Sequence, residues 1–140
     1  MMKIVAEYPP NYKQIEETFN LSGRKPVFAY GDTIYNPHDI ELPDHLIVHE
    51  SVHGRQHSEM VGGADMWWER YLADPEFRLI QEIEAFGAQY KCIRSMYGRR
   101  IADSMLFQLA DLLSSPMYGG VISHGEAESK IRNQAKLLDS

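Results

Sequence analysis

The stretch PDHLIVHESVHGRQHSEM, residues 43–60, carries four histidines at a constant spacing of four residues: His45, His49, His53 and His57. Pro43 before it and the Gly62-Gly63 pair after it are typical helix boundaries, so the stretch is predicted to be one helix. A step of four residues turns the side chain by about 40°, so the four rings would form a stripe about 120° wide. Leu46 and Met60 fall inside the same sector. Histidines on an apolar side of a helix need polar partners there.

One pair of these histidines brackets a glutamate in the pattern H-E-x-x-H, as His49, Glu50 and His53. Neighbours four residues apart lie about 6 Å apart along a helix and can bind one ion, whereas a separation of about 12 Å is too long. Any adjacent pair would satisfy this geometry, but only His49 and His53 have a glutamate directly after the first histidine. Glu50 would then take a proton from a metal-bound water rather than bind the ion. His45 and His57 are interpreted as supporting or partly exposed histidines and not as ligands.

A catalytic zinc needs a third protein ligand, and the candidates downstream are Glu82, Glu84 and Cys92. The predicted helix after Asp74-Pro75 carries an apolar stripe made of Leu79, Ile80, Ile83, Phe86, Tyr90 and Ile93. Glu82 lies about 75° from the centre of that stripe and Glu84 about 120° from it, so Glu82 is expected to reach inward and Glu84 to face solvent. Arg78, four residues before Glu82, would compete for it by pairing. A lone cysteine is more often a small core residue than a ligand.

The sequence HESVH, followed twenty-nine residues later by EIEA, resembles the gluzincin class of zinc metallopeptidases. This resemblance implies that His49 and His53 bind Zn²⁺, that Glu50 is the catalytic base, and that Glu82 is the third ligand with Ala85 as its small neighbour. It also implies a peptide or protein as substrate. The similarity covers residues 26–90 at most. The pattern departs from many members of the class directly after the alanine, where an aspartate is common and this chain has a phenylalanine.

A second resemblance extends over YGDTIYNP and HESVHGRQH, which are similar to compact H-E-x-x-H proteins encoded in bacteriophage genomes. Zincins place an edge strand above the active-site helix, where it pairs with an extended substrate. The resemblance therefore implies that the strand Thr33–Tyr35 is such an edge, since pairing with an edge strand is a general way to hold a peptide.

The chain of 140 residues suits a single domain, 1–140. The expected fold is α+β and mainly helical, a minimal zincin-like domain with a β-hairpin beside the histidine helix. The hairpin is predicted from β-prone residues 27–30 and 33–35 around a Gly31-Asp32 turn. Further helices are expected over residues 9–21, 64–74, 75–97, 101–113 and 124–138. The fourth of these would turn Leu106, Leu109, Leu112 and Leu113 inward, and Ser123 would cap the last.

The composition of the chain limits the kinds of molecule that it is expected to bind. A net charge of -6 argues against nucleic-acid binding, because phosphate recognition needs clustered lysine and arginine. No window approaches the length of a membrane span, and the first ten residues lack an apolar run long enough for a signal peptide. The single cysteine, Cys92, excludes an intramolecular disulfide. We therefore expect a cytoplasmic protein that binds neither nucleic acid nor membrane.

These observations lead to one principal hypothesis and two alternatives. The principal one is a small zinc-dependent metallopeptidase, in which Glu50 serves as base for a zinc-activated water. The first alternative is a non-catalytic protein on the same scaffold, stabilised by a metal or binding a peptide without cutting it. The second is a hydrolase like peptide deformylase, although its cysteine ligand precedes the motif and Cys92 follows it. Tyr90, Tyr118 or His124 would stabilise the oxyanion, and no spacing selects one of them.

Overall fold

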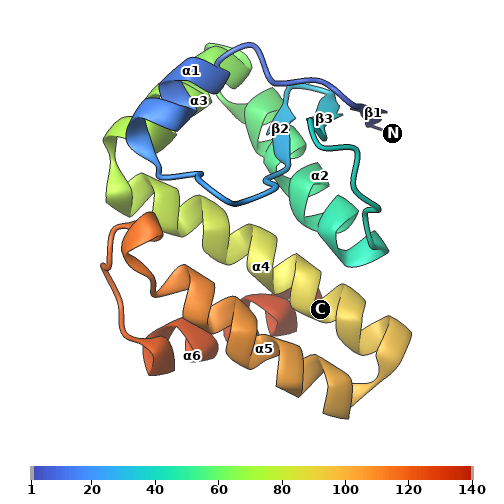
Figure 1. Ribbon diagram of the computed structural model, residues 1–140. Helices are drawn as coiled ribbons and strands as arrows, with labels where there is room; N and C mark the ends of the chain where they lie inside the picture. Colours follow the sequence, from blue (N-terminus) through green and yellow to red (C-terminus); the bar gives the residue numbers. More distant parts are fainter. Residues whose placement is uncertain (1, 140) are drawn as a thin grey trace.

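The computed structural model describes residues 2–139, which form a mainly helical α+β fold. Within this range there are six α-helices, α1 Tyr12–Thr18, α2 Asp44–Glu59, α3 Gly63–Ala73, α4 Pro75–Tyr97, α5 Arg99–Leu113 and α6 His124–Leu138. A 3₁₀ turn, η1 (Pro116–Tyr118), links α5 to the segment before α6. Figure 1 shows α4 crossing the middle of the molecule, with α5 and α6 on one side and α1, α2, α3 and the sheet on the other. None of the described helices is long and apolar enough to cross a membrane.

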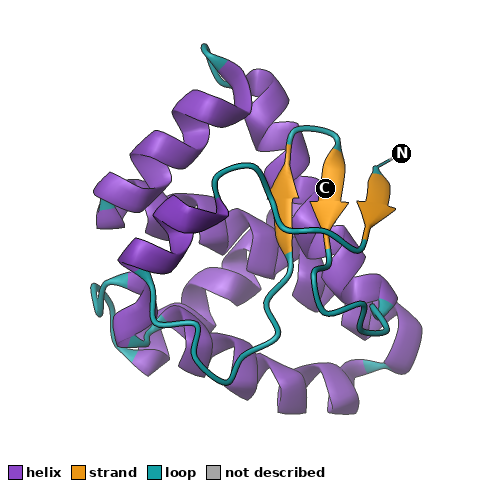
Figure 2. Ribbon diagram, turned by 45° about the horizontal axis from the view of Figure 1, so that its top comes forward, coloured by secondary structure: helices purple, strands orange, loops and turns teal. Residues whose placement is uncertain are grey.

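A small sheet of three strands lies beside α2: β1 Lys3–Val5, β2 Phe28–Tyr30 and β3 Thr33–Tyr35. The strand order is β1-β3-β2, with β1 parallel and β2 antiparallel to β3 (Figure 2). The predicted hairpin is therefore confirmed, and Gly31 supplies the positive φ of 64° that its turn requires. The expectation that Thr33–Tyr35 is an edge strand is wrong, because β1 pairs with its outer side. The free edge on the hairpin is β2.

The two helices that carry the H-E-x-x-H motif and the EIEA sequence begin and end where capping chemistry favours it. Asp74 accepts hydrogen bonds from the backbone N–H groups of Glu76 and Phe77, and Pro75 follows it at the first helical position. Helix α2 ends before Gly62, whose φ is 94°. The Asp74 cap fixes the start of α4, and therefore fixes which of its side chains face α2.

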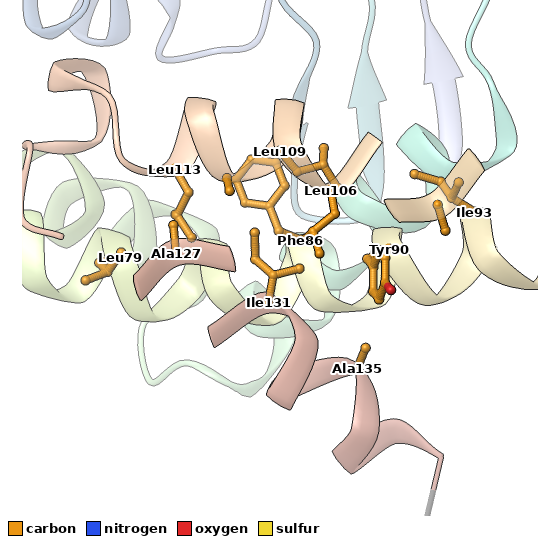
Figure 3. Packing of buried hydrophobic residues seen from close by; sticks show 12 residues of the cluster. Leu79, Phe86, Tyr90, Ile93, Leu106, Leu109, Leu113, Ala127, Ile131 and Ala135 are labelled. Carbon is orange, nitrogen blue, oxygen red and sulfur yellow. The ribbon is translucent and has the colours of Figure 1, made fainter. Parts of the chain in front are cut away.

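The larger hydrophobic cluster holds α4, α5 and α6 together (Figure 3). Its buried residues are Leu79, Phe86, Tyr90, Ile93, Ala102, Leu106, Leu109, Ala110, Leu113, Ala127, Ile131 and Ala135. Two predicted members do not belong to it: Ile80 is 64% exposed and Leu112 is 41% exposed. Both lie at the margin of an apolar stripe that is wider than the surface its partner helices cover. At Gly87 the helices come so close that a Cβ would lie 2.5 Å from Gln134.

A second, mostly aromatic cluster joins α1, β2, α3 and the start of α4. Its buried members are Ile15, Phe28, Trp67, Trp68, Tyr71 and Phe77. The two tryptophans are core residues, with indole N–H groups that donate to Gln81 Oε1 and to the carbonyl of Ala29. The motif helix α2 lies between this cluster and the larger one, so its histidines contact both.

Candidate metal centre

Two histidines of α2 and one glutamate of α4 converge on one point. His49 Nε2 and His53 Nε2 each lie 3.1 Å from Glu82 Oε1. All three side chains are buried, and one ligand atom from each lies within 4.8 Å of the others. Two imidazole nitrogens and a carboxylate oxygen at such spacing can bind a metal ion. Among the described residues this is the one group of histidine, cysteine and acidic side chains that meets that criterion.

In both His49 and His53, the Nδ1 atom, which faces away from Glu82, lies within hydrogen-bond distance of a glutamine. Gln89 Oε1 lies 2.8 Å from His49 Nδ1, and Gln56 Oε1 lies 2.8 Å from His53 Nδ1. An amide oxygen only accepts hydrogen bonds, so both Nδ1 atoms carry the proton. In a neutral ring that leaves the lone pair on Nε2, the atom that faces Glu82. The tautomer suited to binding a metal is thus set before any metal arrives.

The glutamines are themselves anchored by several contacts. Gln56 donates to the carbonyl of Gln81 at 3.1 Å and to Glu84 at 2.7 Å. Gln89 donates to His45 Nδ1 at 2.9 Å, which makes His45 a neighbour of His49 through this amide. Sequence reasoning missed both glutamines. Their positions, three residues after His53 and seven after Glu82, place them on the same helix faces as the residues they serve.

Charge in the site is balanced between one carboxylate and one ring. Burial alone would lower the pKa of His53, but the charge and hydrogen bond of Glu82 outweigh it and raise that pKa to about 9. Burial would raise the pKa of Glu82, yet His53 and His49 together hold it well below its usual range. Without a metal the site is therefore a buried ion pair. A metal ion would take the place of the proton on His53.

The second oxygen of Glu82 is bonded to Tyr71, whose hydroxyl donates to Glu82 Oε2 at 2.5 Å. Burial and the Glu82 charge raise the pKa of Tyr71 well above 10, so it remains a proton donor. This bond directs Oε1 toward the histidines. Arg78 does not compete for Glu82, because it donates instead to the carbonyls of Tyr71 and Leu72. The expected pairing between Arg78 and Glu82 is therefore wrong.

Glu50 lies beside this group without joining it. Its Oε2 is 4.0 Å from His49 Nε2, and the residue is only 7% exposed. Burial raises the pKa of Glu50, while the nearby His49 and His53 oppose that rise. The backbone N–H of Ala29 in β2 also approaches the carboxylate and favours its charged form. A buried carboxylate whose pKa is raised toward neutrality is suited to accept a proton.

The other two histidines of the stripe have different roles. His57 is 1% exposed and accepts a hydrogen bond from the backbone N–H of Gly31 at Nδ1, 3.0 Å away. Burial and the charge of His53 lower its pKa to about 3, so it stays neutral and ties the hairpin turn to α2. Its ring lies 4.4 Å from that of Trp67. Neither histidine belongs to the converging group, as expected: His45 is partly exposed and His57 is buried.

The other candidates for a third ligand lie outside the group. Glu84 is half-exposed and binds Arg55 at 2.7 Å, so its expected position toward solvent is broadly right. Cys92 lies two turns further along α4, with its thiol 3.8 Å from Met96 Sδ. Ala85, the small neighbour in the EIEA sequence, is fully buried, and Phe86 packs its ring 4.7 Å from that of His49. The phenylalanine thus buttresses the first histidine by packing.

A cavity of about 480 Å³ opens onto this group. Glu50, His49, His53 and Glu82 form its polar end, and apolar side chains form most of the remainder. Of the three residues considered for the oxyanion, Tyr118 is the one that lines the cavity. Burial and the charges of Glu82 and Glu50 raise the pKa of Tyr118 well above 10. Tyr90 is instead bonded to Asp103, and His124 lies near Asp111 and Glu128.

Comparison of the chain with protein-family models, with curated proteins and with solved structures gave no match. What the site does is therefore argued from its own chemistry.

Proposed function

We propose that this chain is a small zinc-dependent metallopeptidase of the gluzincin type, in a compact form like those encoded by bacteriophages. The observation that carries the proposal is the convergence of His49, His53 and Glu82, with Glu50 directly beside them at the polar end of a cavity. A purely structural metal site has no need of a buried carboxylate that stays outside the ligand set. That carboxylate is what hydrolysis requires.

The donor set fits zinc. Two neutral imidazoles and one carboxylate make a common catalytic zinc set, which leaves a fourth position for water. The glutamine partners at both Nδ1 atoms leave each Nε2 free to bind, and the Tyr71 bond leaves one oxygen of Glu82 free. One ligand charge against the two charges of the ion leaves net positive charge at the site. When bound, zinc would polarise the scissile carbonyl and lower the pKa of a water molecule.

The residues of the chain would perform the proton transfers. Glu50 takes a proton from the attacking water and passes it to the amine that leaves, and its raised pKa suits both steps. Tyr118 keeps its proton at neutral pH and can donate a hydrogen bond to the oxygen that gains negative charge. Within residues 2–139 its hydroxyl has no hydrogen-bond partner that would compete for this role.

One observation limits how an extended peptide could pair with the sheet, both in the peptidase and in the alternative, a peptide-binding protein that does not cut. Ala29, at the centre of the edge strand β2, has its carbonyl bonded to Trp68 Nε1 at 3.0 Å and its N–H directed at Glu50. An extended substrate therefore has no free backbone partner at this residue and must pair further along, toward Val27.

The deciding experiment measures metal and turnover together. Protein purified without added metal is analysed for its elements and then assayed against a peptide library, with and without a chelator. We expect about one zinc per chain and cleavage that the chelator removes and zinc restores. Zinc without any cleavage would favour the binding protein. A folded chain with no affinity for zinc would overturn the peptidase and leave a metal-free peptide-binding protein as the alternative.

A further inference from the structure

The cavity has two chemically distinct ends. The polar end is the metal group with Glu50, and the walls beyond it are apolar. These walls come from the segment between α1 and β2, from α5 and from η1, and include Phe19, Leu21, Leu109 and Met117. A volume of about 480 Å³ is in the range that binds a small organic molecule or a short piece of peptide. The walls favour an apolar side chain as the occupant.

Two cations stand at the opening of this cavity. Arg24 and Lys25 both line it and both are exposed. Neither forms an ion pair with any described residue, and the partner of the Arg24 guanidinium is Met117 Sδ at 3.7 Å, a weak acceptor. The positive charge of Arg24 also reaches Tyr118, where it opposes the rise in the pKa of that hydroxyl. The guanidinium therefore lines the same cavity as Tyr118, which is proposed to take part in the reaction.

The placement of these cations runs against the charge of the whole chain, which is -6. Among residues 2–139, the acidic side chains that line the cavity are Glu50 and Glu82, and both are buried at the far end with the histidines. A negatively charged ligand therefore meets unpaired positive charge at the opening. Charge-assisted hydrogen bonds from arginine or lysine to a carboxylate are about twice as strong as neutral ones.

We propose that the preferred substrates are peptides that place an apolar side chain in the cavity and a carboxylate against Arg24 and Lys25. This inference rests on the proposed peptidase function and names its substrate class. The carboxylate is either the C-terminus of the peptide or an acidic side chain next to the apolar residue. Both present the same chemistry to the two cations.

The test uses the zinc-loaded full chain and short N-acetylated peptides that end in phenylalanine, as the free acid or the amide. A second pair keeps the amide and has glutamate or glutamine before the phenylalanine. The variants are Arg24→Gln with Lys25→Gln, and Arg99→Gln as a control for charge, since Arg99 is exposed at the start of α5 and remote from the cavity. Both kcat/KM and binding are measured, the latter by calorimetry in the Glu50→Gln background.

We expect the parent and the control to prefer one charged peptide over its neutral partner by about tenfold, in kcat/KM and in affinity. The preference should disappear in the double variant and weaken with added salt. A preference within the acid and amide pair identifies the C-terminus as the source of the carboxylate. A preference within the glutamate and glutamine pair identifies the acidic side chain. Equal cleavage of charged and neutral peptides overturns this inference and leaves the peptidase standing. Preferential binding of a charged peptide without any cleavage supports this recognition of apolar side chain and carboxylate, and overturns the peptidase. Absence of binding by all four peptides overturns it as well.

Discussion

Glu50 is the residue that distinguishes the two proposed functions, because a peptidase needs it as a base and a peptide-binding protein does not. Replacing it with glutamine keeps the shape of the side chain and removes its ability to accept a proton. We expect Glu50→Gln to retain zinc and the fold while losing about a hundredfold or more in kcat. The measurement compares the parent and the variant at matched zinc content on the same peptide. A variant that cleaves as fast as the parent would show that Glu50 is not the base.

The four histidines of α2 allow a comparison within one helix. His49→Ala and His53→Ala should abolish tight zinc binding, because each removes a nitrogen 3.1 Å from Glu82 Oε1. His45→Ala should weaken it only modestly, through Gln89. His57→Ala should leave zinc affinity nearly unchanged but lower stability by about 1–3 kcal/mol, since it removes a buried ring and leaves the Gly31 N–H without its acceptor.

Zinc affinity for these variants is read by competition with a chelator, and stability by thermal unfolding with the chelator present. Loss of zinc in His57→Ala together with retention in His49→Ala would move the site one turn along α2.

At the scale of the element, the phase of α4 decides which glutamate faces the metal. Glu82 is 3% exposed and contacts both histidines, whereas Glu84 binds Arg55 and Gln56. Glu82→Gln should therefore reduce zinc affinity by at least about a hundredfold, because loss of a group that merely supports a ligand already costs about tenfold to a hundredfold and Glu82 is itself a ligand. Glu84→Gln removes the same charge two residues away and should cost far less, because Glu84 acts only through Gln56 and a weaker charge interaction with His53. Equal losses would indicate a general effect of charge and contradict the assigned phase.

The phase of α4 could be predicted because helical periodicity is a local property, and the helix keeps it through Gly87. The boundaries of α2, α4 and α6 were predictable for the same reason, since their capping residues lie next to them in sequence. Ser123 caps α6 as expected, and Glu126 completes a capping box with it. The width of an apolar stripe was less predictable, as Ile80 shows: how far its margin is covered depends on the partner helix.

Strand β1 escaped prediction because its three residues carry little pattern and pair in parallel with β3, thirty residues further along the chain. Its absence from the expected fold is what made β3 look like an edge. Gln56 and Gln89 were missed for another reason. An amide on a helix has no signature of its own, and its value here comes only from the histidine opposite.

At the scale of the whole molecule, the metal group joins parts of the chain that otherwise pack separately. Phe86 of the larger cluster contacts His49, while Trp67 of the aromatic cluster lies 5.2 Å from His53, ring to ring. A metal bound to α2 and α4 therefore links both clusters. It stabilises the native state by an amount that grows with the ratio of metal concentration to the dissociation constant.

The same link gives the stability of the metal-free fold and the stabilisation added by the metal opposite dependences on pH. In the metal-free protein the pKa of His53 rises from 6.5 to about 9, so its pairing with Glu82 stabilises fully below pH 6.5 and is lost as the pH rises to about 9. The pKa of Glu82 is lowered, so its contribution is present above 4.5 and fades in acid. This pair therefore favours the metal-free fold most strongly between pH 4.5 and pH 6.5.

Zinc requires the neutral form of His53, so its binding releases a proton wherever that ring is charged, and zinc affinity should increase with pH up to about 9. We expect the chelated protein to lose thermal stability between pH 6.5 and 9, while the increase in Tm caused by zinc becomes larger over the same range. Thermal unfolding with chelator or with a fixed concentration of free zinc measures both trends. His38→Gln, at an exposed histidine, should preserve them, and His53→Gln should remove them. An increase in Tm that is the same at every pH would mean that His53 is not the residue whose proton the metal displaces.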